Sequence, residues 1–244
     1  MKGFKKIIYT LLLFAGIHKS AVAQEAAIDK ELKKIQDAYQ SRDYLSFNVQ
    51  YLYSYFKEPE TYIDTVYGSY KLSKNKYWAK MDDVEFIQND SLLIAVYPED
   101  RVLLINRAVP NWVDMISNWE KLWQQQKSKL QAAVDKSSAT GKIVLNYTGD
   151  SIYKRVEIWY NQTTFLTERL VFVIKQPQFL MEDGDEEKLS DDFSIIEVRL
   201  TAYDSKPFEP FIFSTANYIN TVNGKVTPSS KYKEYTILSG APTK

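Results

Sequence analysis

The sequence predicts an α+β fold in a single domain: an incomplete, half-open antiparallel β-barrel or a strongly curved sheet, with a helical lid. Three observations predict this class. An amphipathic helical pattern opens the domain, a series of short segments with strand periodicity and turn signals follows, and a second amphipathic segment interrupts the strands. The 244 residues suit one large domain.

The first 23 residues predict a cleavable signal peptide. Lys2, Lys5 and Lys6 precede an apolar run over residues 7–17, and Ala21-Val22-Ala23 places small residues where a signal peptidase cuts. A membrane anchor is the alternative, but the run is shorter than the roughly 20 residues of a spanning helix. We therefore expect residues 24–244 to form a soluble, exported domain in the periplasm.

Composition excludes several kinds of chemistry. Cysteine is absent, and the one histidine, His18, lies within the predicted signal peptide. The exported domain therefore has no disulfide, no cysteine-based metal site and no imidazole for acid–base catalysis. Loss of Lys2, Lys5, Lys6 and Lys19 with the signal peptide leaves about four more acidic than basic residues, which argues against nucleic acid as a partner. We expect no enzymatic activity, metal or cofactor.

The first half of the domain changes from helical to strand periodicity. Ile28, Leu32, Ile35 and Tyr39 recur at four, three and four residues, which predicts a one-faced helix that ends near residue 41. The period then becomes two and predicts an antiparallel meander, with strands over residues 47–55, 65–72, 76–81, 84–88, 92–97 and 101–105.

The last two of these strands are apolar on both faces, so each face needs a covering layer. We expect the next segment to supply one, because a helical spacing connects Trp112, Met115, Ile116, Trp119, Leu122, Trp123, Leu130 and Val134. A lid helix of this kind either fills the core or closes a cavity over the concave face of the sheet. Its tryptophans are ordinary core in the first case and the wall of an acyl-chain site in the second.

Strands return after Gly141, over residues 142–147, 151–160, 165–175 and 193–203. Residues 176–192 form a longer connection than a hairpin needs and carry an acidic run, so we expect a flap or an unstructured excursion there. That run lacks the residue order of a calcium loop. Asn223-Gly224 indicates a hairpin turn before a last strand over residues 232–238.

Two further patterns have simpler explanations. Asp82, Asp83 and Glu85 offer carboxylates for a glycosidase-type pair, but neighbouring acids at a turn point in different directions. Tyrosines that alternate along the strands can form a sugar-stacking surface, but tyrosine also suits a half-buried sheet.

Residues 47–107 carry a series of short motifs. A strand of alternating apolar residues leads to GSYKL at residues 68–72, KNKYW follows at residues 74–78, and polar turns occupy residues 89–91 and 97–100. This stretch resembles the periplasmic lipoprotein carriers, the LolA-like proteins, in which a G-x-[FY]-x-[LI] strand, a basic-aromatic strand start and two turns occur in the same order.

The resemblance implies a signal peptide, an N-terminal helix and an incomplete barrel that a helical lid closes over a cavity for lipid chains. The carriers usually have an arginine directly before the tryptophan, whereas Tyr77 precedes Trp78 here, so arginine-based control of the lid is not carried over. The absence of cysteine favours the soluble carrier over its lipid-anchored relative.

We therefore expect a non-enzymatic periplasmic carrier or binding protein for a lipidated or hydrophobic ligand, with lipid or lipoprotein acyl chains as its partners. We expect the ligand cavity to be lined by Val49, Tyr51, Tyr53, Tyr70, Leu72, Trp78, Phe86, Ile94, Val96, Trp112, Met115, Ile116 and Trp119.

Two alternatives remain: an envelope scaffold or interaction subunit with a filled core, whose partners are envelope proteins, and a hydrolase that uses only carboxylates and hydroxyls. An acyl-chain site should exceed about 300 Å³ and be lined almost wholly by carbon. The hydrolase needs two carboxylates that face each other.

Overall fold

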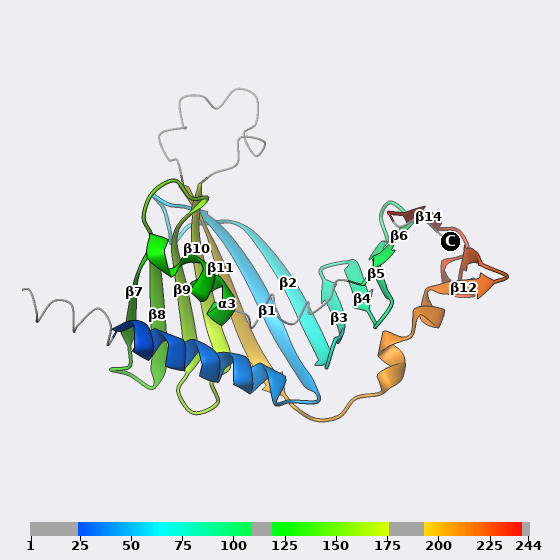
Figure 1. The fold of residues 1–244 in the computed structure, drawn as a ribbon. Coiled ribbons are helices and arrows are strands. Elements are labelled where there is room, and N and C mark those ends of the chain that lie inside the picture. Colours follow the sequence, from blue (N-terminus) through cyan, green and yellow to red (C-terminus); the bar gives the residue numbers. More distant parts are fainter. Residues whose placement is uncertain (1–23, 109–118, 176–192, 241–244) are drawn as a thin grey trace, which may run out of the picture.

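The computed structural model describes residues 24–108, 119–175 and 193–240 (Figure 1). The predicted signal peptide, the lid residues Trp112, Met115 and Ile116, and the acidic connection 176–192 lie outside the described residues. A helix spans residues 24–40, as its apolar spacing predicts. The first meander contains β1 (Leu45–Tyr55), β2 (Tyr62–Ser73), β3 (Lys76–Met81), β4 (Val84–Gln88), β5 (Leu92–Tyr97) and β6 (Val102–Arg107).

A second series of elements follows the helix α3 (Trp119–Gln126) and the short helix η1 (Lys127–Lys129). Its strands are β7 (Leu130–Asp135), β8 (Thr140–Tyr147), β9 (Tyr153–Asn161), β10 (Thr167–Lys175) and β11 (Phe193–Asp204). The C-terminal segment then contains η4 (Pro210–Phe213), η5 (Thr215–Asn217), β12 (Ile219–Val222), β13 (Lys225–Pro228), η6 (Ser230–Tyr232) and β14 (Thr236–Ser239).

Twelve strands of the described residues form one sheet, in the order β14-β6-β5-β4-β3-β2-β1-β11-β10-β9-β8-β7. Strand β1 joins the two halves, because it pairs with β2 on one side and with β11 on the other. The sheet is strongly curved, and within the described part of the chain its end strands β7 and β14 are not paired with each other (Figure 1). The predicted class, an α+β domain with a curved and unclosed sheet, is confirmed.

The N-terminal helix crosses one half of the sheet, on the face that we call the inner face (Figure 1). At its start the Gln24 side chain donates to the backbone of β7. In the middle Tyr160 of β9 donates to Glu31 over 2.8 Å, and near the end the hydroxyls of Tyr39 and Tyr203 of β11 lie 2.8 Å apart. The helix therefore covers β7 to β11.

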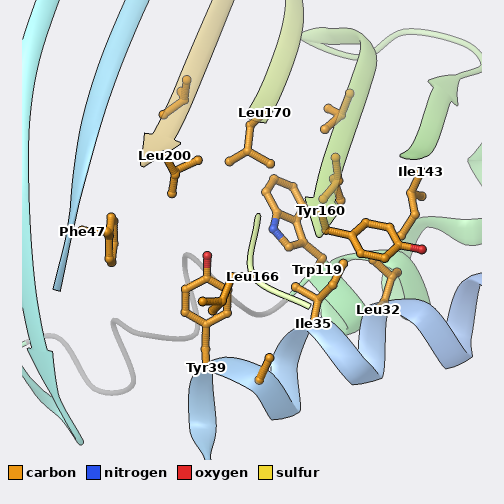
Figure 2. Close-up of a cluster of buried hydrophobic side chains, with 14 of the residues drawn as sticks. Leu32, Ile35, Tyr39, Phe47, Trp119, Ile143, Tyr160, Leu166, Leu170 and Leu200 are labelled. Atoms are coloured by element: carbon orange, nitrogen blue, oxygen red, sulfur yellow. The ribbon is translucent and has the colours of Figure 1, made fainter. Parts of the chain in front are cut away.

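A single core fills the space under this helix (Figure 2). Ile28, Leu32 and Ile35 are almost completely buried and pack against side chains of β8, β9 and β10. Helix α3 joins the same core through Trp119 and Trp123, and the indole N–H of Trp123 donates to Asp29 of the N-terminal helix over 2.6 Å. The two helices thus form one layer.

The predicted extent of the second helix is wrong, because the helix ends at Gln126 and Leu130 and Val134 lie on the edge strand β7. A spacing of four residues is about one helical turn, but it is also two repeats of a strand. Leu130 pairs with Tyr147 and Val134 with Ile143, so both belong to a β-ladder.

The C-terminal segment differs from the expected final hairpin. Asn223 and Gly224 form the predicted turn, both with positive φ, but the turn joins β12 to β13 in a separate two-stranded sheet. Residues 232–238 are not one strand, because Tyr232 ends η6 and only β14 pairs with the main sheet. That pairing, with β6, is parallel, so the sheet as a whole is not antiparallel throughout, although the meander β1 to β6 is.

The same segment covers the outer face of β4 to β6. Ile94, Val96 and Leu103 pack there in a second core cluster with Tyr218 and with other residues of the C-terminal segment. The sequence predicts that the lid helix covers this strand pair. In the described part of that segment, the buried residues of α3 belong instead to the first core. The outer face of β4 to β6 is covered by the C-terminal segment instead. The helical spacing of the lid residues carries no information about that later segment.

Glu31 is the charged group on which the first core depends. Its carboxylate is 1% exposed and accepts hydrogen bonds from Lys136, Tyr160 and Lys34. Burial opposes ionisation of Glu31, but these hydrogen bonds outweigh it and hold the pKa of the carboxyl below its usual value of 4.5. The stabilisation is therefore complete above pH 4.5 and is lost as the pH falls through the lowered pKa.

We expect Glu31→Gln to destabilise the protein by about 1–3 kcal/mol at pH 7, because the amide loses the charge that three donors share. The variant should also lose less stability than the wild type as the pH falls below 4.5 and through the lowered pKa of Glu31, because only the wild type has a carboxylate that becomes protonated there. Urea unfolding across this pH range measures both effects. Asp37→Asn on the same helix is the control, because its exposed ion pair with Lys33 should leave stability nearly unchanged. Equal acid sensitivity in Glu31→Gln and wild type would contradict this account.

Candidate functional site

The inner face beyond the N-terminal helix, over β1 to β5, is hollowed into a groove of about 440 Å³. We call it the inner groove, and its lining residues are Tyr51, Tyr53, Val66, Met81, Asp82, Val84, Phe86 and Tyr97. Seven of these eight side chains are aromatic, aliphatic or thioether groups. The inner groove is therefore larger than the minimum of about 300 Å³ expected of an acyl-chain site, and its wall is mainly carbon.

Strand register determines which side chains form the wall. Tyr51 and Tyr53 alternate with outward-facing residues along β1, and Val66 stands opposite Tyr51 on β2. The tight turn between β3 and β4 places Met81 opposite Val84. Residues that are far apart in the sequence are thus brought onto one surface.

Gly68 allows β1, β2 and β3 to pack closely beneath this wall. A Cβ atom at this position would lie 2.9 Å from the backbone oxygen of Lys80 and 3.0 Å from side-chain carbons of Met81 and Val49. Since glycine has no side chain, Met81 can lie against β2. A larger residue here would push Met81 into the groove.

The polar groups in and around the groove are mostly neutral hydroxyls. The Tyr51 and Tyr70 hydroxyls are 3.4 Å apart, and the Tyr70 hydroxyl contacts the sulfur of Met81 at 3.7 Å. Burial raises the pKa of Tyr53 and of Tyr70 above the usual value of 10, so both remain protonated at neutral pH. Such groups can orient a polar headgroup, but they add no charge to the wall.

The three acids that the sequence offers for catalysis are not gathered into one site. Asp82 lines the groove and accepts from the backbone N–H of Tyr67. Glu85 lies on the outer face, where it accepts from the Trp78 indole and, over 2.6 Å, from the Tyr218 hydroxyl. The paired carboxylates of a glycosidase are therefore not formed by these acids. Among the described residues, no cluster of three or more acidic or histidine side chains is arranged to hold a metal ion.

The predicted cavity residues do not all lie in one cavity: they are found in the inner groove, in the first core and on the outer face. Tyr51, Tyr53 and Phe86 line the inner groove. Three others also face inward but are packed in the first core: Val49, Tyr70 and Leu72. On the opposite, outer face lie Trp78, Ile94 and Val96, which pack or open toward the C-terminal segment. Trp119 is buried against Phe172 of β10, far from β4 and β5 in the order of the sheet.

Sequence reasoning missed five wall residues: Val66, Met81, Asp82, Val84 and Tyr97. For Met81 and Val84 the signal is the shortness of the β3–β4 turn, which places these two residues opposite each other. Alternation alone could not assign a face to β5, because both of its faces are apolar.

A second pocket of about 540 Å³ lies on the outer face, between β3, β4 and the C-terminal segment. Its walls combine Trp78, Glu85 and Tyr218 with Ile212, Ala216, Asn217, Ser229, Ser230 and Lys231. Hydroxyl, amide and charged groups predominate here. This pocket lacks the carbon wall that an apolar chain requires.

These features define a class: an α+β domain in which helices cover part of the inner face of a long, curved, unclosed sheet. No protein-family model matches the sequence, and no curated protein matches it significantly. Solved structures similar to the chain include an uncharacterized conserved protein from Thermus thermophilus, which is 7% identical with a TM-score of 0.49 over 87% of this chain and 99% of that chain.

They also include a LolA superfamily protein from Nitrosomonas europaea, 12% identical with a TM-score of 0.35 over 76% of this chain and 96% of that chain. A chain of the MucA/MucB complex from Pseudomonas aeruginosa is 12% identical, with a TM-score of 0.43 over 80% of this chain and 63% of that chain. The LolA superfamily, which residues 47–107 resemble, thus occurs among the structural neighbours. Identities and TM-scores are low, so the function proposed below rests on the chain's own residues. None of the described helices is long and apolar enough to cross a membrane.

The open groove and the packed outer face should respond differently to the same truncation. Val96→Ala removes two methyl groups from a residue that is 2% exposed and should cost about 2 kcal/mol. Val66→Ala removes the same groups from the groove wall and should cost no more than about half as much, because that side chain is only partly buried. Urea unfolding of both variants measures the difference. Equal losses would show that the groove is filled in solution.

Proposed function

We propose that this protein is a non-enzymatic carrier or binding protein of the cell envelope, which holds the apolar chain of a lipid or lipidated ligand in the inner groove. The proposal is supported by one observation above all: a groove of about 440 Å³ whose wall is mainly carbon, on a sheet that also carries two packed core clusters. Its tyrosine hydroxyls would contact the more polar end of the ligand. Export by the signal peptide, residues 1–23, belongs to the same proposal.

An interaction subunit with no lipid site is the second candidate. It is favoured by the packing under the N-terminal helix, where the residues that a lid would close over are already buried against one another. In that case the inner groove would receive a side chain of an envelope protein. The two candidates differ in whether a free acyl chain binds.

We expect the delipidated protein to bind a dansyl-labelled undecanoic acid saturably, with a blue shift of the probe. Val84→Glu should weaken this binding at least tenfold, about 1.4 kcal/mol, because a carboxylate in the carbon wall must be desolvated when the chain enters. Val222→Glu, on an exposed strand of the separate hairpin, is the matched control and should bind as the wild type does.

Fluorescence titration of the three proteins distinguishes the carrier from the interaction subunit. Urea unfolding verifies that each protein is folded. No saturable binding by the wild type would exclude the carrier proposal and leave the interaction subunit. Equal weakening in both glutamate variants would show that the probe binds outside the groove.

A further inference from the structure

Exposed apolar side chains gather at one end of the sheet. Ten large hydrophobic residues in the described part of the chain are exposed, and five of them occupy this end: Tyr55, Phe56, Tyr62, Ile63 and Ile152. We call this group the apolar tip. Exposed apolar residues that are scattered singly need no explanation, but a contiguous group marks an interaction surface.

Backbone hydrogen bonds show that the apolar tip is continuous. The N–H of Lys175, the last residue of β10, donates to the carbonyl of Ile152 just before β9. Next to it, the N–H of Phe56 at the end of β1 donates to Phe193, the first residue of β11. Tyr62 begins β2 and pairs with Ser54. Five adjacent strands thus contribute to one edge.

Cationic groups lie over aromatic rings at the apolar tip. The Lys154 ammonium lies 4.5 Å from the ring centroids of both Phe56 and Phe193. The Arg199 guanidinium donates to the Tyr62 hydroxyl over 3.0 Å. Tyrosine and lysine, each with an apolar body and a polar end, are suited to the boundary between water and lipid acyl chains.

Among the described residues, the charges at the apolar tip are of both signs in equal number. Four basic residues lie there with four acidic residues of the same end: Lys57, Lys154, Lys175 and Arg199 with Glu58, Glu60, Asp64 and Asp150. A charged protein partner would be matched by a net charge of the opposite sign. Balanced charge around exposed aromatic and aliphatic groups instead matches a bilayer surface that is entered by apolar insertion.

We infer that the apolar tip docks on the surface of a lipid bilayer. The inner groove lies next to it, because Tyr53 of the groove is two residues before Tyr55 and Val66 is three residues after Ile63. Docking would therefore bring the groove beside the lipid. Transfer of a ligand between the bilayer and the inner groove rests on the proposed function, whereas the binding of the apolar tip to the bilayer does not.

Sedimentation with phosphatidylcholine vesicles tests the inference. The wild type should sediment with the vesicles, and roughly 0.5 M NaCl should change the bound fraction little, because insertion and not charge drives the binding. The double variant Ile63→Ser/Ile152→Ser removes side chains that are 54% and 65% exposed and should lower the partition coefficient at least fivefold. The matched control Leu238→Ser/Val222→Ser removes side chains that are 51% and 65% exposed on other elements and should bind as the wild type does.

Three outcomes would overturn the inference: a wild type that does not sediment, equal losses in the two double variants, or binding that appears only with anionic vesicles at low salt. The dansyl-acyl titration separates this result from the proposed function. Vesicle binding without probe binding would support membrane docking by the apolar tip and exclude lipid binding in the inner groove. Probe binding without vesicle binding would support lipid binding in the groove and exclude membrane docking by the tip.

Discussion

The antiparallel pairing between β1 and β11 holds the two halves of the sheet together. It joins residues that are about 140 positions apart, such as Leu52 and Glu197, over nearly the whole length of β1. Without it the chain would form two separate meanders, each with an open edge. The continuous inner face, on which both helices pack, exists only because this pairing is made.

The length of the N-terminal helix then determines where the groove lies. Seventeen residues extend for about 25 Å, and strands are spaced about 4.8 Å apart, so a helix that crosses the strands can cover roughly five of them. Gln24 and Tyr39 mark its contacts with β7 and β11, the first and last strands of that five. The inner face continues beyond this last contact over β1 to β5, and the groove lies there.

Much of this architecture could be predicted from residue patterns, and the failures have physical causes. Period-two segments and turn residues located most strands, and the spacing of Ile28 and Leu32 located the first helix. The spacing of Leu130 and Val134 fits helix and strand equally well. Of the residues predicted to line a ligand cavity, Tyr51, Tyr53 and Phe86 lie on the wall of the inner groove, whereas Ile94 and Val96 lie on the outer face. A strand that is apolar on both sides carries no signal for its orientation, which a distant C-terminal segment decides.

The separation of β1 and β11 in the sequence also constrains how the protein is made. Strand β1 emerges early from the ribosome, while its second partner follows about 140 residues later. Until then β1 presents unpaired backbone groups and the apolar residues Phe47 and Val49, which are buried in the finished fold. Closing so long a loop is slow, because its entropy must be lost before the contacts compensate. The nascent chain thus passes through a prolonged stage with an open sheet edge, during which protection by a chaperone has the greatest effect on yield.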